Sequence, residues 1–267
     1  MAKYKKKRAR ELQHDRFRDT TMSLFDRLGD ALEGRGQTIL YALGGLVVAA
    51  LLVIFFVKWN ARKNDEARQA LGRAITIATA TVSSTPVSNP SDNTFSSEQA
   101  RSQRAIQEFE KVAAKYGDPY KTEARYFIAT NQLTLDRQKG MTELAELGNS
   151  NIPEVAALSK FALAQAKESD GKLDEAAQLY VALVKLNSPT VTPETANLRL
   201  AKVYQKQGKK KEATDLLFSL VDASRKSKGK DELPLPPSSA AREAASELQK
   251  LDPDRYAQLP QEAPALG

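Results

Sequence analysis

Two stretches of sequence decide the fold: residues 163–186 read LAQAKESDGKLDEAAQLYVALVKL, and residues 200–223 read LAKVYQKQGKKKEATDLLFSLVDA. When they are aligned on Gly171 and Gly208, which lie 37 residues apart, the two stretches carry matching residue types. On both sides of each glycine, apolar residues recur at the three- and four-residue spacing of an amphipathic helix. Each stretch therefore predicts a helix, a glycine turn and a second helix.

The shared positions define a predicted repeat core. The small pair Ala164 and Ala176, repeated as Ala201 and Ala213, would let two antiparallel helices approach closely, and larger side chains would fill the space beside them. The predicted core residues are Leu163, Ala164, Gly171, Ala176, Tyr180, Leu183, Leu200, Ala201, Tyr204, Gly208, Ala213, Leu217 and Leu220.

These positions resemble the tetratricopeptide repeat (TPR), with Tyr204 at the aromatic position of the first helix and Lys167 as the departure in the other unit. Fainter units precede them: a second-helix pattern at 105–112 with its mate near 67–80, and a degenerate unit whose second helix, near 141–147, should be short. The resemblance implies an α-solenoid of about four helix pairs, because fewer than about three repeats do not bury a continuous core.

A different pattern lies towards the N-terminus, where Ile39–Val57 reads ILYALGGLVVAALLVIFFV without a charged side chain. A helix of this length matches the hydrocarbon thickness of a bilayer, and Lys58 and Trp59 suit the headgroup zone. The overall prediction is an all-α chain with one transmembrane helix followed by the TPR-like solenoid. The small pair Gly44 and Gly45 would allow helix packing in a homodimer.

The distribution of charge predicts the direction of crossing. Residues 1–38 carry ten Lys/Arg against six Asp/Glu, which favours a cytoplasmic N-terminus and a periplasmic C-terminal domain. The twenty residues on either side of the anchor favour the opposite direction. The excess of cations in the tail also predicts contact with anionic membrane lipids.

Composition shifts divide the chain into four segments. Residues 1–36 form a basic tail with an amphipathic interfacial helix, and 37–58 form the transmembrane helix. Residues 59–226 form the repeat domain, with a mobile insert at 83–97 that is rich in Ser, Pro and Asn. Residues 227–267 form a proline-rich linker, a capping helix and a disordered tail.

The composition leaves few groups for catalysis or metal binding. The chain has no cysteine and a single histidine, His14, in the basic tail. We therefore expect no enzyme activity, no cofactor and no metal site. The remainder after the tail has 30 Lys/Arg against 27 Asp/Glu, a balance that does not favour nucleic acid as a partner.

At the scale of the whole chain, the order of tail, anchor and repeats resembles the bacterial ancillary SecYEG translocon subunit family. The resemblance implies a single-pass inner-membrane protein whose periplasmic repeats assist secreted or envelope proteins, with translocon subunits, chaperones or secreted clients as partners. The alternative is an envelope assembly or cell-division factor that acts through self-association of the repeats.

Repeat phase also predicts where a partner would lie. Residues of the first helices that are not core would face the groove of a solenoid. The candidates are Gln165, Glu168, Lys202, Gln205 and Lys206, and their mixed charge suggests peptides or helices of other proteins.

Overall fold

The computed structural model describes residues 36–83 and 94–261, with side chains from residue 51 onward. The predicted basic tail and interfacial helix, most of the insert and the last six residues lie outside this range. The chain divides into two compact units between Asn64 and Asp65, and each unit is described by itself.

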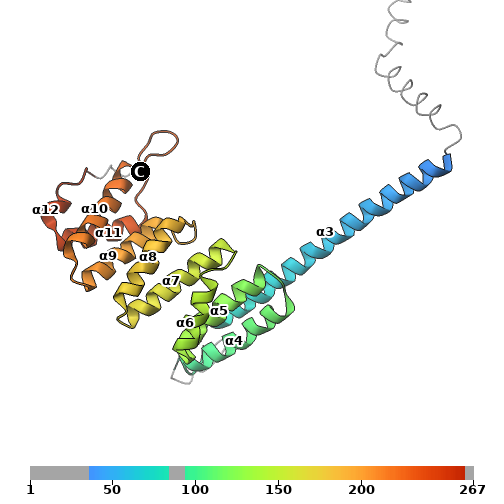
Figure 1. Ribbon diagram of the computed structural model, residues 1–267, viewed down its shortest axis with the longest axis horizontal. Coiled ribbons are helices and arrows are strands. Elements are labelled where there is room, and N and C mark those ends of the chain that lie inside the picture. Colours follow the sequence, from blue (N-terminus) through green and yellow to red (C-terminus); the bar gives the residue numbers. More distant parts are fainter. Residues whose placement is uncertain (1–35, 84–93, 262–267) are drawn as a thin grey trace, which may run out of the picture. The chain divides into compact units, whose positions relative to one another are not determined.

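The described residues are predominantly helical (Figure 1). The helices are α3 (Gly36–Ala78), α4 (Glu98–Lys115), α5 (Tyr120–Leu135), α6 (Arg137–Leu147), α7 (Pro153–Ser169), α8 (Leu173–Leu186), α9 (Pro193–Lys206), α10 (Lys210–Lys226), α11 (Ser239–Leu251) and α12 (Pro253–Tyr256). Two short strands, β1 (Thr81–Val82) and β2 (Thr94–Phe95), pair in parallel. Thr94 and Phe95, near the end of the predicted insert at 83–97, pair with the segment that follows α3.

The predicted anchor, Ile39–Val57, lies within α3, which continues past it without a break. Seven consecutive apolar side chains of α3, from Leu51 to Val57, are each more than half exposed. In the part of the chain that the structure describes, no helix is both long enough and apolar enough to cross a membrane.

Local chemistry explains where several helices begin. The side chains of Ser97, Asp136 and Ser238 each accept a hydrogen bond from a backbone N–H three residues on. Thr192 does the same, and Pro193 follows it as the first residue of α9, where a missing N–H costs no hydrogen bond. These caps satisfy backbone donors that a helix leaves without partners in its first turn.

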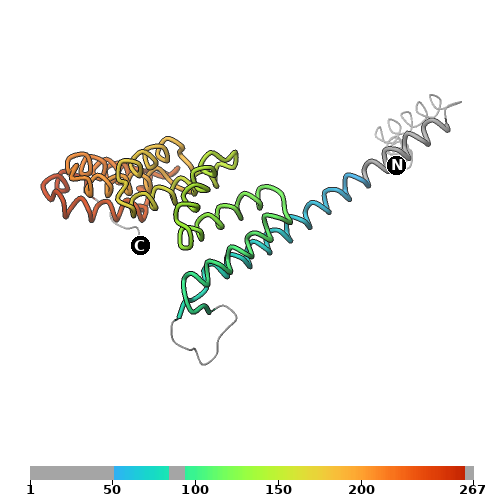
Figure 2. The backbone as a smooth tube through the Cα atoms, turned by 60° about the horizontal axis from the view of Figure 1, so that its bottom comes forward, coloured from blue at the N-terminus to red at the C-terminus, as the bar shows by residue number. Residues whose placement is uncertain are grey.

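Four apolar clusters hold unit 2 together, and each joins a helix pair to its neighbour. Leu71 and Ala74 of α3 pack with Ala105 and Phe109 of α4, as expected for the mate of the 105–112 segment. The next clusters join α5, α6 and α7, then α7, α8 and α9, then α9, α10 and α11. Figure 2 shows the helices from α4 to α11 following one another along the backbone. A helix contacts mainly its sequence neighbours, which is the organisation of a solenoid.

The last cluster extends beyond the predicted capping helix. Leu259 is buried against α10 and α11, and the hydroxyl of Tyr256 accepts a hydrogen bond of 3.2 Å from Arg225. Arg255 pairs with Asp215 at 2.5 Å. The prediction of a disordered tail is therefore wrong for residues 253–261, because an apolar side chain and two cation contacts fix this segment on α10.

Candidate protein-binding groove

The two glycine turns that divide the predicted repeat units have the same geometry. Gly171 has φ of 73° and Gly208 has φ of 75°, a region that side-chain-bearing residues rarely adopt. In both turns the N–H of the residue after the glycine bonds back to a first-helix carbonyl, Lys172 to Lys167 and Lys209 to Tyr204, at 2.9 Å. Each turn therefore ends one helix and starts the next with the same backbone geometry.

The small residues of the predicted core lie where the helices of a pair meet. Ala164, Ala176, Ala201 and Ala213 have no exposed surface. The larger predicted core side chains are buried beside them, except Tyr204, which is half-buried, and both glycines are exposed. Phe161 contacts the ring of Tyr180 edge-on, with centroids 6.0 Å apart. These buried contacts pack one face of α7 and α9 against their neighbours and leave the remaining side chains on the other face.

The candidate groove residues fall on α7 and α9, and two of them are in contact. The ammonium group of Lys206 lies 2.6 Å from the Glu168 carboxylate, which also accepts a 3.1 Å hydrogen bond from the hydroxyl of Tyr180. Burial raises the pKa of the Tyr180 phenol, and the nearby Glu168 carboxylate raises it further. Glu168 therefore links the buried core of one repeat to a surface cation of the next.

Lys202 adds a second ion pair, which joins α9 to α11. Its ammonium group pairs with Glu243 of α11, and this hydrogen bond lowers the pKa of the Glu243 carboxyl. The other two candidates differ from this pattern. Gln165 is exposed, and Gln205 is half-buried with an Nε2 that has no partner among the described residues. Polar contacts thus link α7 to α9 and α9 to α11, and they define a surface on the first helices of successive repeats.

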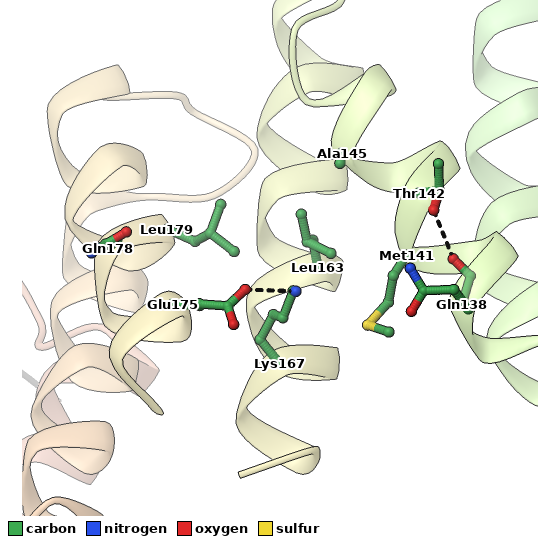
Figure 3. Close-up of a pocket in the computed structure, with 9 residues that line it drawn as sticks. All are labelled: Gln138, Met141, Thr142, Ala145, Leu163, Lys167, Glu175, Gln178 and Leu179. Atoms are coloured by element: carbon green, nitrogen blue, oxygen red, sulfur yellow. Dashed lines mark hydrogen bonds and ion pairs between the residues drawn. The ribbon is translucent and has the colours of Figure 1, made fainter. Parts of the chain in front are cut away.

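A second surface was not predicted from the sequence. A cavity of about 480 Å³ lies between α6, α7 and α8, and its apolar lining includes Met141, Leu163 and Leu179 (Figure 3). At its edge Lys167 pairs with Glu175 at 2.6 Å. Lys167 occupies the position that is aromatic in the TPR pattern and that holds Tyr204 in the next repeat. In this repeat, the ion pair with Glu175 takes the place of that aromatic side chain. No local motif marks the cavity, because its lining comes from three helices.

Metal-ligating side chains do not gather into a site in the described range. In residues 36–83 and 94–261, no group of three or more His, Asp or Glu side chains is placed to hold a metal ion. The Arg125 guanidinium binds Glu143 and Glu146 at 2.7 and 2.9 Å, so these two carboxylates join α5 to α6.

The helix pairs, their glycine turns and their shared clusters define the class: unit 2 is a TPR-like helical-repeat domain. No family model matches the chain, and no curated protein matches it. Two solved structures are similar. One is a crystal structure of nearly identical TPR-like repeats of a kinesin light chain-type protein from Podosopora anserina, 18% identical over 70% of this chain and 85% of that one, with a TM-score of 0.48. The other is a single-substitution variant of it, 17% identical over 70% and 84%, also at 0.48.

Proposed function

We propose that the chain is a membrane-anchored scaffold whose TPR-like repeats bind partner proteins through the first-helix surface of α7 and α9. The observation that supports this most is the pairing of Lys206 with Glu168 and of Lys202 with Glu243 on that surface. Both lysines retain exposed area, whereas the Glu168 side chain is only 12% exposed and also accepts the Tyr180 hydrogen bond. Ion pairs at the surface are worth at most about 1 kcal/mol, so a partner's anionic groups could replace the contacts of the two lysines at little cost. The proposal includes no enzyme activity.

The anchor is the second part of the proposal. It rests on the sequence Ile39–Val57 and is supported by the exposure of the side chains from Leu51 to Val57. Contiguous exposed apolar surface of this kind is typical of a site that contacts a membrane or another protein. The rings of Trp59 and Phe55 contact edge-to-face, with centroids 5.3 Å apart. The ammonium group of Lys63 lies 5.1 Å from the centroid of the Trp59 ring. A ring with a cation beside it suits the membrane–water interface.

The location and the partners that we propose follow from the resemblance of the whole chain to the ancillary SecYEG translocon subunit family. We infer a bacterial inner-membrane protein with a cytoplasmic N-terminus and periplasmic repeats that assist secreted or envelope proteins at the Sec translocon. A reporter enzyme fused after Gly267 tests the direction. Activity confined to periplasmic reporters is expected, and activity confined to cytoplasmic reporters would contradict the direction.

Site-specific photocrosslinking tests the scaffold. A photoreactive residue at Gln165, exposed on α7, should form adducts with translocon subunits, chaperones or secreted clients. The matched control is Lys185, exposed on α8 and not part of the cavity lining, which should form few of these adducts. Adducts with a second copy of the chain alone would instead favour the self-association alternative, and equal yields at both positions would contradict the assigned surface.

A further inference from the structure

The connection between α10 and α11 exposes apolar side chains of unit 2. It runs over residues 227–238, the longest link between the helices from α4 to α11. Among the described residues of unit 2, three large apolar side chains are more than two fifths exposed, and two of them are Leu233 and Leu235, each at 48%. They belong to the leucine–proline segment, which reads Leu233-Pro234-Leu235-Pro236-Pro237. It lies in the orange-red loop after α10 (Figure 1).

Backbone hydrogen bonds hold this segment outward. Gly229 N–H donates to the carbonyl of Leu233 at 2.8 Å, and Leu235 N–H donates to Ser227 at 3.0 Å. Lys228 and Pro234 thus form an antiparallel bridge. Glu232, with φ of 61°, reverses the chain between the two sides. Because Leu233 and Leu235 are two residues apart in extended backbone, they lie on the same side. Both leucines are therefore exposed on one side of the loop.

The prolines limit how another molecule could bind the segment. Pro234, Pro236 and Pro237 have no N–H, so the segment cannot add as a strand to the edge of a sheet, which requires regular donors. A helical bound form is excluded by the same residues. What remains is a polyproline II conformation, which proline favours by fixing φ near −65°, and which loses little conformational entropy on binding.

The charges beside the segment decide whether a lipid surface, instead of a protein domain, is a suitable partner. Lys228 and Lys230 are balanced by Asp231 and Glu232, all exposed. A loop with no net charge gains no electrostatic attraction to anionic headgroups. Proteins that bind polyproline II segments do so in grooves lined with aromatic side chains. We therefore propose that the leucine–proline segment is a second binding site, separate from the first-helix surface, for a partner domain with an aromatic-lined groove.

The test measures binding of the full chain in detergent micelles to a panel of purified SH3 and WW domains. The readout is the NMR spectrum of each isotope-labelled domain as the chain is added. At least one domain should bind with a Kd below 1 mM. Leu233→Ser combined with Leu235→Ser should weaken binding at least tenfold, and Pro236→Ala with Pro237→Ala should also weaken it. Leu186→Ser, at the third exposed leucine, is the control and should leave the Kd unchanged.

Three results would overturn the proposal. The first is no binding at 1 mM by any domain, and the second is equal binding by the double-leucine variant. The third is insertion of the segment into lipid: in the chain reconstituted in phosphatidylcholine–phosphatidylglycerol vesicles, an environment-sensitive dye on a cysteine placed at the exposed Lys230 would report an apolar surrounding that is lost when the two leucines become serine. Unchanged thermal midpoints of all variants establish that the repeats remain folded.

Discussion

Replacing Gly208 by alanine should destabilise the repeats through the backbone alone. A Cβ added at Gly208 or at Gly171 meets no atom within 4 Å, so the substitution causes no clash. Both residues have φ near 75°, where a side-chain-bearing residue costs about 1–2 kcal/mol. Alanine also restricts the unfolded chain, which returns about 0.4–1 kcal/mol. The net expected loss is therefore about 1 kcal/mol for each glycine, and equal at the two sites.

Gly72 provides a control at which the same substitution should raise the stability instead of lowering it. It lies within α3 at ordinary helical geometry, and a Cβ there also meets nothing within 4 Å. Gly72→Ala should stabilise the protein by about 0.5–1 kcal/mol, because glycine weakens helix interiors.

The assay is thermal unfolding of the full chain in detergent, followed by far-ultraviolet circular dichroism. A loss of 1 kcal/mol corresponds to about 2–4 °C in a domain of this size. Gly208→Asn should lower the midpoint less than Gly208→Ala, because asparagine tolerates the left-handed region. Clearly unequal losses at Gly171 and Gly208 would refute the reasoning that the two turns are equivalent. A loss of stability for Gly72→Ala would refute the assignment of the effect to backbone conformation.

Three further changes test the packing and the polar network. Leu217→Ala should cost about 2–5 kcal/mol in urea unfolding because Leu217 has no exposed surface, whereas the exposed Leu186→Ala should change little. Gly140→Ala should cost about 1–3 kcal/mol, since its Cβ would lie 2.8 Å from both Ala129 O and Leu133 N of α5; a neutral result would mean that α5 and α6 separate freely. The raised pKa of Tyr180 means that the native state favours the neutral phenol, so its contribution to stability is present below pH 10 and is lost as pH rises above it. Tyr180→Phe should reduce the loss of stability between pH 9 and 11, and an identical pH profile would contradict the assignment.

The sequence predicts what depends on local patterns. Gly171 and Gly208 mark their turns because the left-handed region favours glycine, and the alternation of alanine with larger residues marks the helix faces that pack. The short helix predicted near 141–147 lies within α6, which begins earlier, at Arg137. These features need no knowledge of distant residues.

The remaining features depend on contacts between residues far apart in the chain. The ion pair between Glu168 and Lys206 joins positions 38 residues apart, and no spacing rule selects that lysine over Lys202. Leu259 follows a proline and a short helix, so only its burial on α10 reveals an ordered segment. The two-residue strands β1 and β2 are too short to show an alternating pattern.

Charge reversal on the first-helix surface tests the central claim most directly. The full chain, its Lys202→Glu/Lys206→Glu variant and a Lys210→Glu/Lys211→Glu control at the exposed start of α10 would be crosslinked in cells and their adducts quantified. We predict that the first variant loses its partner adducts, while the control retains them and both melt within a few degrees of the unaltered protein. Identical adducts from all three proteins would contradict the assignment of the α7–α9 surface as the site of partner binding.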